Sequence, residues 1–342
     1  MKISTAVNYA GDIVKAADTV ARLEAAGIDT VWIAEAYSFD AVSLMGYLAA
    51  KTSTVNIGSG ILNIYSRTPS CLGQTAAGLD AVSNGRAILG LGASGPQVIE
   101  GFHGLPYDRP LARTREIIEI CRMMWRREKV EHTGIYNLPL PEGQGTGLGK
   151  SLKLINHPVR SAIPIYVAAI GQKNVTMTAE IADGWLPIFF MPEKANDVWG
   201  KALAAGKAKR AADLPELDVV AGGLFAIGDG MEGVREFMRP QLALYIGGMG
   251  ARGKNFYNQL ACEYGFEQEA KLVQDLYLDG KKDEAAKEIP AAMLESMTLV
   301  GPEGYIKEKI AAFRDAGVTN LQVTAVSPDP IADLEKLKAW AE

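Results

Sequence analysis

The strongest constraint on the fold of this chain is the repeated alternation of short apolar segments with longer segments of helical periodicity. Parallel strands are joined through helices, so this alternation predicts a (β/α)8 TIM barrel with insertions. A doubly wound open sheet is the alternative, although it rarely runs to eight regular units in a chain of this length. The predicted strands are 3–9, 29–34, 55–60, 87–91, 163–168, 185–190, 218–227 and 320–326, and the predicted helices are 12–26, 40–51, 69–82, 109–127, 173–182, 193–212, 302–316 and 331–340.

The length of the chain agrees with a barrel that carries insertions. A TIM barrel takes about 250 residues, and this chain has 342, of which 48% are hydrophobic. Residues 131–161 are rich in Gly and Pro, and residues 228–300 are mostly helical in pattern. No change in composition marks a linker, so we expect one domain over residues 1–342.

The composition argues against several classes of protein. A formal net charge of −5 offers no basic surface to a nucleic acid. No run reaches the roughly 18 apolar residues of a membrane span, and the first residues lack the apolar core of a signal peptide. The cysteines Cys71, Cys121 and Cys262 form no CxxC pair, which is typical of a reducing compartment. We therefore expect a cytoplasmic protein that binds neither nucleic acid nor membrane.

No motif predicts a metal or a dinucleotide. His103, His132 and His157 are not in HExxH spacing, and no paired thiolates accompany them. Residues 90–95 satisfy GxGxxG, but Pro96 and a loop follow where a dinucleotide-binding unit would begin its helix. We expect no metal site.

The segment VNIGSGILNIYSRTP, residues 55–69, is an apolar strand that stops at a corner of small residues. Gly58, Ser59 and Gly60 carry almost no side chain, so a ligand can approach the backbone closely there. Ile61 and Leu62 follow as an apolar shelf, and Asn63 ends it with a polar group.

This corner resembles the luciferase-like monooxygenase superfamily, and specifically its coenzyme F420 (deazaflavin) branch, which includes methylenetetrahydromethanopterin reductase and F420-dependent dehydrogenases. The resemblance runs from VWIAE (31–35) through ADGWLP (182–187) to GVTNLQV (317–323). It implies a non-proline cis peptide at Gly60–Ile61 behind the deazaflavin ring. The cofactor-contact candidates near the ring are Gly60, Ile61, Asn63, Ala93 and Ser94.

A second similar segment is YVAAIGQKNVTMTAEIADGW, residues 166–185, in which a strand, a short turn and a helix follow one another. Free amides at a helix start bind phosphate, and Lys173 adds a cation. The resemblance implies that this turn holds the phosphodiester of the cofactor. The residues expected there are Ala169, Ile170, Gly171, Gln172 and Lys173.

Glu35 directly follows the second predicted strand, where catalytic groups of a TIM barrel gather. Relatives usually carry Asp followed by His at the matching place, whereas this chain has Glu35 and Ala36. The missing imidazole argues against a sugar-phosphate dehydrogenase mechanism. We expect Glu35 to orient or protonate the substrate, with Asn8, Tyr37 and His103 as substrate-pocket candidates.

These features together predict an F420-dependent oxidoreductase that transfers a hydride between the deazaflavin and a small organic substrate. An FMN-dependent monooxygenase of the same superfamily is the first alternative, and a barrel that binds a cofactor without catalysis is the second. The resemblance also implies a homodimer. In agreement with this, the helix at 40–51 carries more apolar surface than one inward stripe requires.

Overall fold

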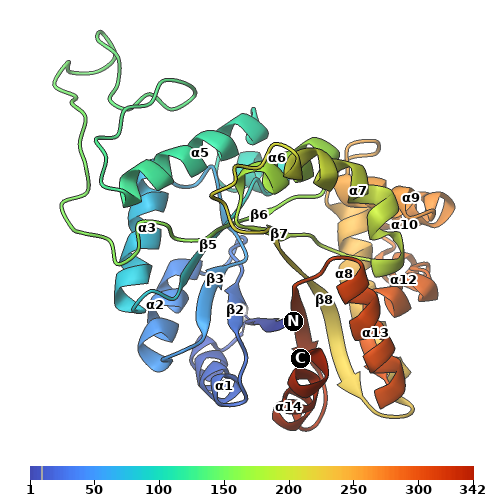
Figure 1. Cartoon of the computed structure of the whole chain (residues 1–342). Coiled ribbons are helices and arrows are strands. Elements are labelled where there is room, and N and C mark those ends of the chain that lie inside the picture. The colour runs from blue at the N-terminus through green and yellow to red at the C-terminus, as the bar shows by residue number, and fades with distance from the viewer. Residues whose placement is uncertain (9–10) are drawn as a thin grey trace.

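The computed structural model describes residues 1–8 and 11–342, and within them the strands close into a parallel barrel. Each barrel strand pairs with the next, and the last returns to the first, so the predicted (β/α)8 barrel is confirmed (Figure 1). The barrel strands in order are β1 (Lys2–Ala6), β2 (Thr30–Ile33), β3 (Asn56–Ser59), β5 (Ala87–Gly92), β6 (Ile165–Ala168), β7 (Gly184–Leu186), β8 (Asp218–Ile227) and β10 (Asn320–Ala325).

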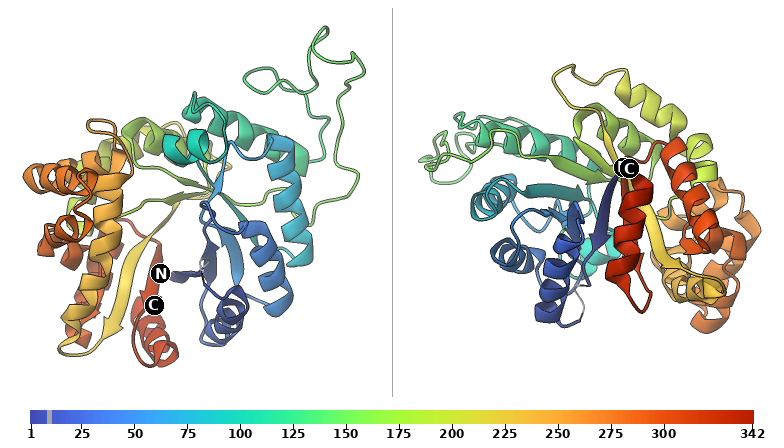
Figure 2. Two further views of the ribbon diagram at one scale, coloured as in Figure 1. Left: turned by 180° about the vertical axis from the view of Figure 1, so that it is seen from behind. Right: turned by 60° about the horizontal axis from the view of Figure 1, so that its bottom comes forward.

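Helices surround the barrel on its outside (Figures 1 and 2). The surrounding helices are α1 (Ile13–Ala25), α2 (Ala41–Lys51), α3 (Pro69–Val82), α5 (Pro110–Trp125), α6 (Gln172–Ile181), α7 (Pro192–Lys207), α13 (Glu303–Asp315) and α14 (Pro330–Ala341). Polar side chains begin several of them: Asp12, Asp40 and Thr68 each accept a hydrogen bond from an amide of the first turn. Among the described residues, no helix combines the length and the apolar character needed to cross a bilayer.

Two excursions leave this plan. The segment after β8 forms a helical lobe of η1 (Met231–Met238), α8 (Arg239–Ala243), η2 (Leu244–Gly248), α9 (Phe256–Glu263), α10 (Glu267–Leu278), α11 (Lys282–Lys287) and α12 (Ala291–Ser296). The loop between α5 and β6 reaches outward (Figure 1). Both ends of this loop are bonded to the helices beside it. Near its start, the Ile135 amide donates to Glu116 of α5 (3.1 Å), and near its end, Arg160 donates to Asp80 of α3.

Several element bounds differ from the sequence predictions. The sixth strand was expected over 185–190, but β7 ends at Leu186, and Phe189 has a φ of 53°, which an extended strand excludes. The first strand was expected to reach residue 9, which lies outside the described residues; β1 ends at Ala6. The short elements β4 (Leu62–Asn63), α4 (Pro96–Gly101) and β9 (Leu299–Gly301) were not predicted, because so few residues show no period.

Two large rings fill the interior of the barrel. The strand register points Trp32, Ile88, Tyr166 and Val220 inward, and all four are buried. The ring centroids of Trp32 and Tyr166 lie 5.3 Å apart. This layer is the floor beneath the carboxyl-terminal end of the barrel.

Glycines on neighbouring strands make room for these rings. A Cβ atom at Gly58 would lie 2.4 Å from the Trp32 ring, and one at Gly184 would lie 2.3 Å from the Tyr166 ring. At Gly90 a Cβ would meet the Ser59 carbonyl oxygen at 1.7 Å. The glycines that resemble a dinucleotide motif therefore include one that strand packing itself requires.

A buried polar group lies below the floor. The Tyr166 hydroxyl donates to Asp218 Oδ2 (2.6 Å), and the Lys2 ammonium lies 3.0 Å from the same oxygen. Burial alone would raise the pKa of Asp218, but the hydrogen bonds from Thr319 and Tyr166 and the charge of Lys2 outweigh it and lower that pKa. Tyr166 is thereby held through its ring, which packs against Trp32, and through its hydroxyl, which is bonded to Asp218.

Replacing Gly58 with Ala should destabilise the barrel by about 1–3 kcal/mol, because the new methyl group overlaps the Trp32 ring. The midpoint of urea unfolding measures this, with Gly304→Ala as the matched control on α13, where a Cβ meets nothing within 4 Å. An unchanged midpoint for Gly58→Ala would show that the ring does not fix the floor.

Candidate active site

The carboxyl-terminal end of the barrel is open above the aromatic floor. Several residues that face inward at this end are small and, unlike the floor, are half-buried or exposed; they include Ala6, Gly60, Ala168 and Gly222. Longer polar side chains, Gln322 and Thr324, face inward from β10. We refer to this open end as the barrel mouth. Because the loops after parallel strands meet there, it is the usual place for a ligand in this fold.

The corner after β3 has the geometry that the resemblance implied. The Gly60–Ile61 peptide is cis, so this prediction is confirmed. The Ile61 side chain lies against Gly92 of β5, where a Cβ would approach it to 2.8 Å. The Ser59 hydroxyl donates to the Gly90 carbonyl and accepts from the Gly90 amide, both at 2.8 Å. These contacts join the corner to the neighbouring strand.

Asn63 lies at the end of this corner, and its side chain is buried. Its Oδ1 accepts from the amides of Tyr65 (3.0 Å) and Ser66 (2.7 Å). Its Nδ2 lies 3.3 Å from His103 Nε2. The structure therefore brings His103, a residue far along the sequence, to the polar tip that follows the corner.

The segment after β5 passes close to the same place. Ala93 is half-buried and Ser94 is exposed, with a φ of 56° at Ser94. The Ser94 carbonyl accepts from the Tyr107 hydroxyl at 3.4 Å. The Phe102 ring lies 5.1 Å from His103 and 6.4 Å from Tyr37, so residues after β2 and β5 meet beside the mouth.

The turn before α6 is anchored from behind by two indoles. Trp185 Nε1 donates to the Ala169 carbonyl (2.9 Å), and Trp199 Nε1 donates to the Ile170 carbonyl (2.8 Å). The Gln172 side chain donates to the Val198 carbonyl (2.7 Å), so it is turned toward α7. The backbone amide of Gln172 is therefore its main donor toward the turn.

This turn has the properties of a phosphate site. Gly171 is the N-cap of α6 and supplies no side-chain cap, and the first turn of the helix carries no acidic residue. A Cβ at Gly171 would meet nothing within 4 Å, and Lys173 is exposed. The first amides of a helix have no intrahelical acceptor and attract anions. The residues present thus fit a phosphate group.

Glu35 is held in a bidentate ion pair. Arg67 Nη1 lies 2.5 Å from Glu35 Oε1, and Arg67 Nη2 donates to Oε2 at 2.8 Å. The Ala41 amide at the start of α2 also donates to Oε2 (3.0 Å). The Glu35 carboxylate raises the pKa of Arg67. The pair joins the loop after β2 to the loop after β4, and the catalytic role of Glu35 stays a prediction.

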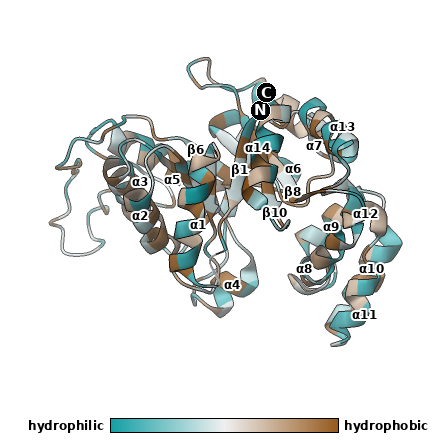
Figure 3. Ribbon diagram, turned by 90° about the horizontal axis from the view of Figure 1, so that it is seen from below, coloured by the Kyte–Doolittle hydropathy of each residue, from teal (hydrophilic) through white to brown (hydrophobic). Residues whose placement is uncertain are grey.

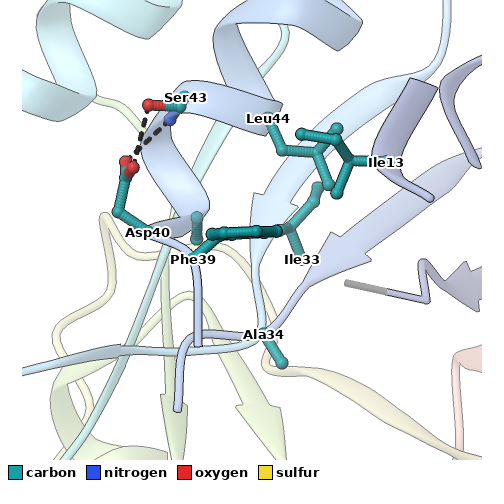
Figure 4. A pocket seen from close by; sticks show the side chains of 8 residues that line it. Ile13, Ile33, Ala34, Phe39, Asp40, Ser43 and Leu44 are labelled. Atoms are coloured by element: carbon teal, nitrogen blue, oxygen red, sulfur yellow. Dashed lines mark hydrogen bonds between the residues drawn. The ribbon is translucent and has the colours of Figure 1, made fainter. Parts of the chain in front are cut away.

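A small hollow of about 200 Å³ lies next to this pair, where α1 and α2 begin (Figure 4). Ile13, Ile33, Leu44 and Phe39 give it an apolar lining, and Asp40 caps α2 through Ser43 at its rim. None of the predicted cofactor residues lines it, so it is separate from the barrel mouth.

Asn8 and Tyr37 follow β1 and β2 at the same end of the barrel, and both are exposed. Sequence reasoning missed Arg67, Gly222 and Gln322. Arg67 could have been noticed because it lies in the segment that ends the corner, and Gly222 because glycine is unusual inside a strand. Nothing in the sequence singles out Gln322.

The comparisons with known proteins agree with this geometry. The family model described as Luciferase-like monooxygenase matches residues 1–320. The chain belongs to the luciferase-like monooxygenase family. A Mycobacterium tuberculosis protein, named as a proposed coenzyme F420-dependent oxidoreductase, is 41% identical over 94% of this chain and 93% of its own length.

Two further proteins to which this chain is similar are reductases. The 5,10-methylenetetrahydromethanopterin reductase of Archaeoglobus fulgidus is 27% identical over 89% of this chain and 87% of its own length. The solved structure of the coenzyme F420-dependent tetrahydromethanopterin reductase from Methanopyrus kandleri superposes with a TM-score of 0.79, at 22% identity, over 98% of this chain and 96% of that one. This structural likeness shows the shared fold.

Replacing Arg67 with Met should cost about 2 kcal/mol of stability, because it leaves the largely buried Glu35 carboxylate without its partner. Adding Glu35→Gln to this variant should recover most of the loss, because the remaining amide carries no charge. Urea unfolding of the two single variants and the double variant measures the coupling. Additive losses would show that the pair contributes nothing as a pair.

Proposed function

We propose that this luciferase-like protein is an F420-dependent oxidoreductase that acts on a small organic substrate. The observation that carries the proposal is the uncapped start of α6, with exposed Lys173, at the same end of the barrel as the Gly60–Ile61 corner. The relatives named for F420 or for methylenetetrahydromethanopterin reduction support it. A bound deazaflavin supplies two-electron chemistry, in which a hydride is given or accepted.

The protein residues have separate tasks in this proposal. Gly60, Ile61 and Asn63, together with Ala93 and Ser94, support the ring. The backbone of residues 169–173 and the Lys173 ammonium bind the phosphodiester through charge-assisted hydrogen bonds. Gln172 takes part through its backbone amide, because its side chain is directed to the Val198 carbonyl of α7.

The substrate would lie between the ring and the side chains after β1, β2 and β5. Asn8, Tyr37 and His103 are its proposed contacts, and His103 is oriented by Asn63. Glu35 would act on the substrate as an acid only after exchanging its contact with Arg67. If it keeps that contact, it positions the loops that surround the substrate.

Replacing Lys173 with Ala should weaken the binding of F420 about tenfold at low salt, because one charge contact to the phosphate is lost. The difference should shrink as salt is added, since salt screens exposed charges. Titration of deazaflavin fluorescence measures the affinity. Lys207→Ala is the matched control, because Lys207 is exposed at the far end of α7.

Three results, two from titrations and one from an activity assay, would contradict the proposal in different ways. Equal affinity of Lys173→Ala and the unaltered protein at low salt would remove the phosphate assignment. Tight binding of FMN in place of F420 would favour the monooxygenase alternative. Binding of F420 without reduction or oxidation by any substrate would favour the non-catalytic barrel.

We propose that the protein is cytoplasmic, acts as one domain and forms a homodimer through α2 and α3. Figure 3 shows these helices next to each other. From Ala41 to Ala50 there is no charged residue, and from Pro69 to Val82 there is only Asp80, which is buried and paired with Arg160. An uncharged outer surface on two adjacent helices is typical of an interface.

Sedimentation velocity at micromolar concentration should therefore show a dimer. Gly78→Glu should give a monomer, because it places a charge on the outer face of α3, where a Cβ meets nothing within 4 Å. Gly304→Glu, on α13, is the control and should remain dimeric. A monomeric unaltered protein would contradict the proposal.

A further inference from the structure

Three aromatic rings from two distant segments meet beside the barrel mouth. Phe189 lies in the loop after β7, and Tyr245 and Tyr257 belong to the helical lobe after β8. Their ring centroids are 5.2 Å apart for Phe189 and Tyr245, 6.1 Å for Phe189 and Tyr257, and 4.7 Å for Tyr245 and Tyr257. We call these three residues the aromatic wall.

The orientation of Phe189 is fixed by the chain around it. Its φ of 53° is uncommon for a bulky residue, and such conformations gather at functional sites. The Tyr264 hydroxyl donates to the Phe189 carbonyl (2.9 Å) and accepts from the Met191 amide (3.4 Å). Buried Tyr264 thus holds the turn that directs the Phe189 ring toward the helical lobe.

Tyr245 is fixed by a different device. It lies in η2, a turn of π-helix, and such turns are frequent at functional sites. Gly247 and Gly248 of this turn pack directly on Tyr277 of α10, and a Cβ at either position would approach the tyrosine to 2.4 Å. Only glycine allows η2 to lie so close to α10. The positions of Phe189 and Tyr245 are therefore both fixed by the packing of their own segments.

Further rings come from other loops at the same end of the barrel. Tyr107, which follows β5, lies 5.4 Å from Tyr65 between ring centroids. Its phenol is close enough to Tyr257 to contribute to the raised pKa of that residue, whose main cause is burial. Tyr37 and Phe102 form an exposed pair 6.4 Å apart. Rings therefore come from loops after β2, β5 and β7 and from the lobe after β8.

The rings of the aromatic wall carry no charge. Burial raises the pKa of Tyr107 and, more strongly, that of Tyr257, so both phenols stay neutral at ordinary pH. At the same end of the barrel, the Glu35 carboxylate is paired with the Arg67 guanidinium. Neutral aromatic rings favour flat partners that carry no negative charge, since an anion would lose its hydration without gaining a counter-ion.

We infer that the substrate of this oxidoreductase has a flat, conjugated ring system without negative charge, which binds against the aromatic wall. The inference rests on the proposed function, because it places the ring system beside the cofactor. It gives the wall the task of selecting planar substrates. His103, which is oriented by Asn63, remains for orienting the substrate.

Three related probes test this selection. Naphthol is flat and uncharged at neutral pH, decahydronaphthol is uncharged but not flat, and naphthalenesulfonate is flat but charged. Calorimetric titrations into protein saturated with F420 should show naphthol binding at least tenfold more tightly than either of the others. Equal binding of decahydronaphthol, or tighter binding of naphthalenesulfonate, would overturn the inference.

Variants locate the binding on the wall. Tyr257→Leu should weaken naphthol binding at least fivefold, and Tyr257→Phe, which keeps the ring, should restore it. Phe256→Leu is the matched control, because Phe256 is exposed on the same helix and makes no ring contact with the described residues. Equal naphthol binding by Tyr257→Leu and the unaltered protein, or a loss in Tyr257→Phe as large as in Tyr257→Leu, would overturn the wall assignment.

The same titrations separate this inference from the proposed function. If F420 binds and naphthol is not selected, the substrate inference alone is wrong. If F420 does not bind the unaltered protein at all, the proposed function is wrong and the substrate inference fails with it.

Discussion

The packing of Trp32 and Tyr166 inside the barrel is the contact on which the rest of the structure depends. The two rings close the interior and need glycine at 58 and 184 to fit. Above them many inward-facing residues are small and less buried than the floor, so the interior is more open toward the carboxyl-terminal end. A ligand can therefore enter only as far as this floor, which is itself fixed by the hydrogen bond from Tyr166 to Asp218.

The loops above the floor are joined to one another rather than left independent. The ion pair of Glu35 and Arg67 joins the loops after β2 and β4, and the contact of Asn63 with His103 joins β4 to the segment after β5. The indoles of Trp185 and Trp199 hold the turn before α6 from behind. Such cross-links keep binding groups in place before a ligand arrives, which lowers the entropic cost of binding. The same cross-links mean that a substitution at one loop is felt at its neighbour.

The sequence predicted the barrel well because its signals are local. Helix α3 and strand β8 have the predicted bounds, and the Gly60–Ile61 corner was found from its small residues and its resemblance to a family. The end of β7 was predicted too late, because the turn at Phe189 is held by a hydrogen bond from Tyr264, a residue 75 positions away. Glu35 could be placed at a strand end, but its pairing with Arg67 depends on how two loops meet in space. The aromatic wall was not predicted for the same reason.

The central claim is that this barrel mouth holds a deazaflavin. The most direct measurement is the absorption spectrum and mass of the cofactor released from protein purified from a host that makes both F420 and FMN. We expect the released compound to have the mass of F420 and the spectrum of a deazaflavin. Release of FMN alone would contradict it.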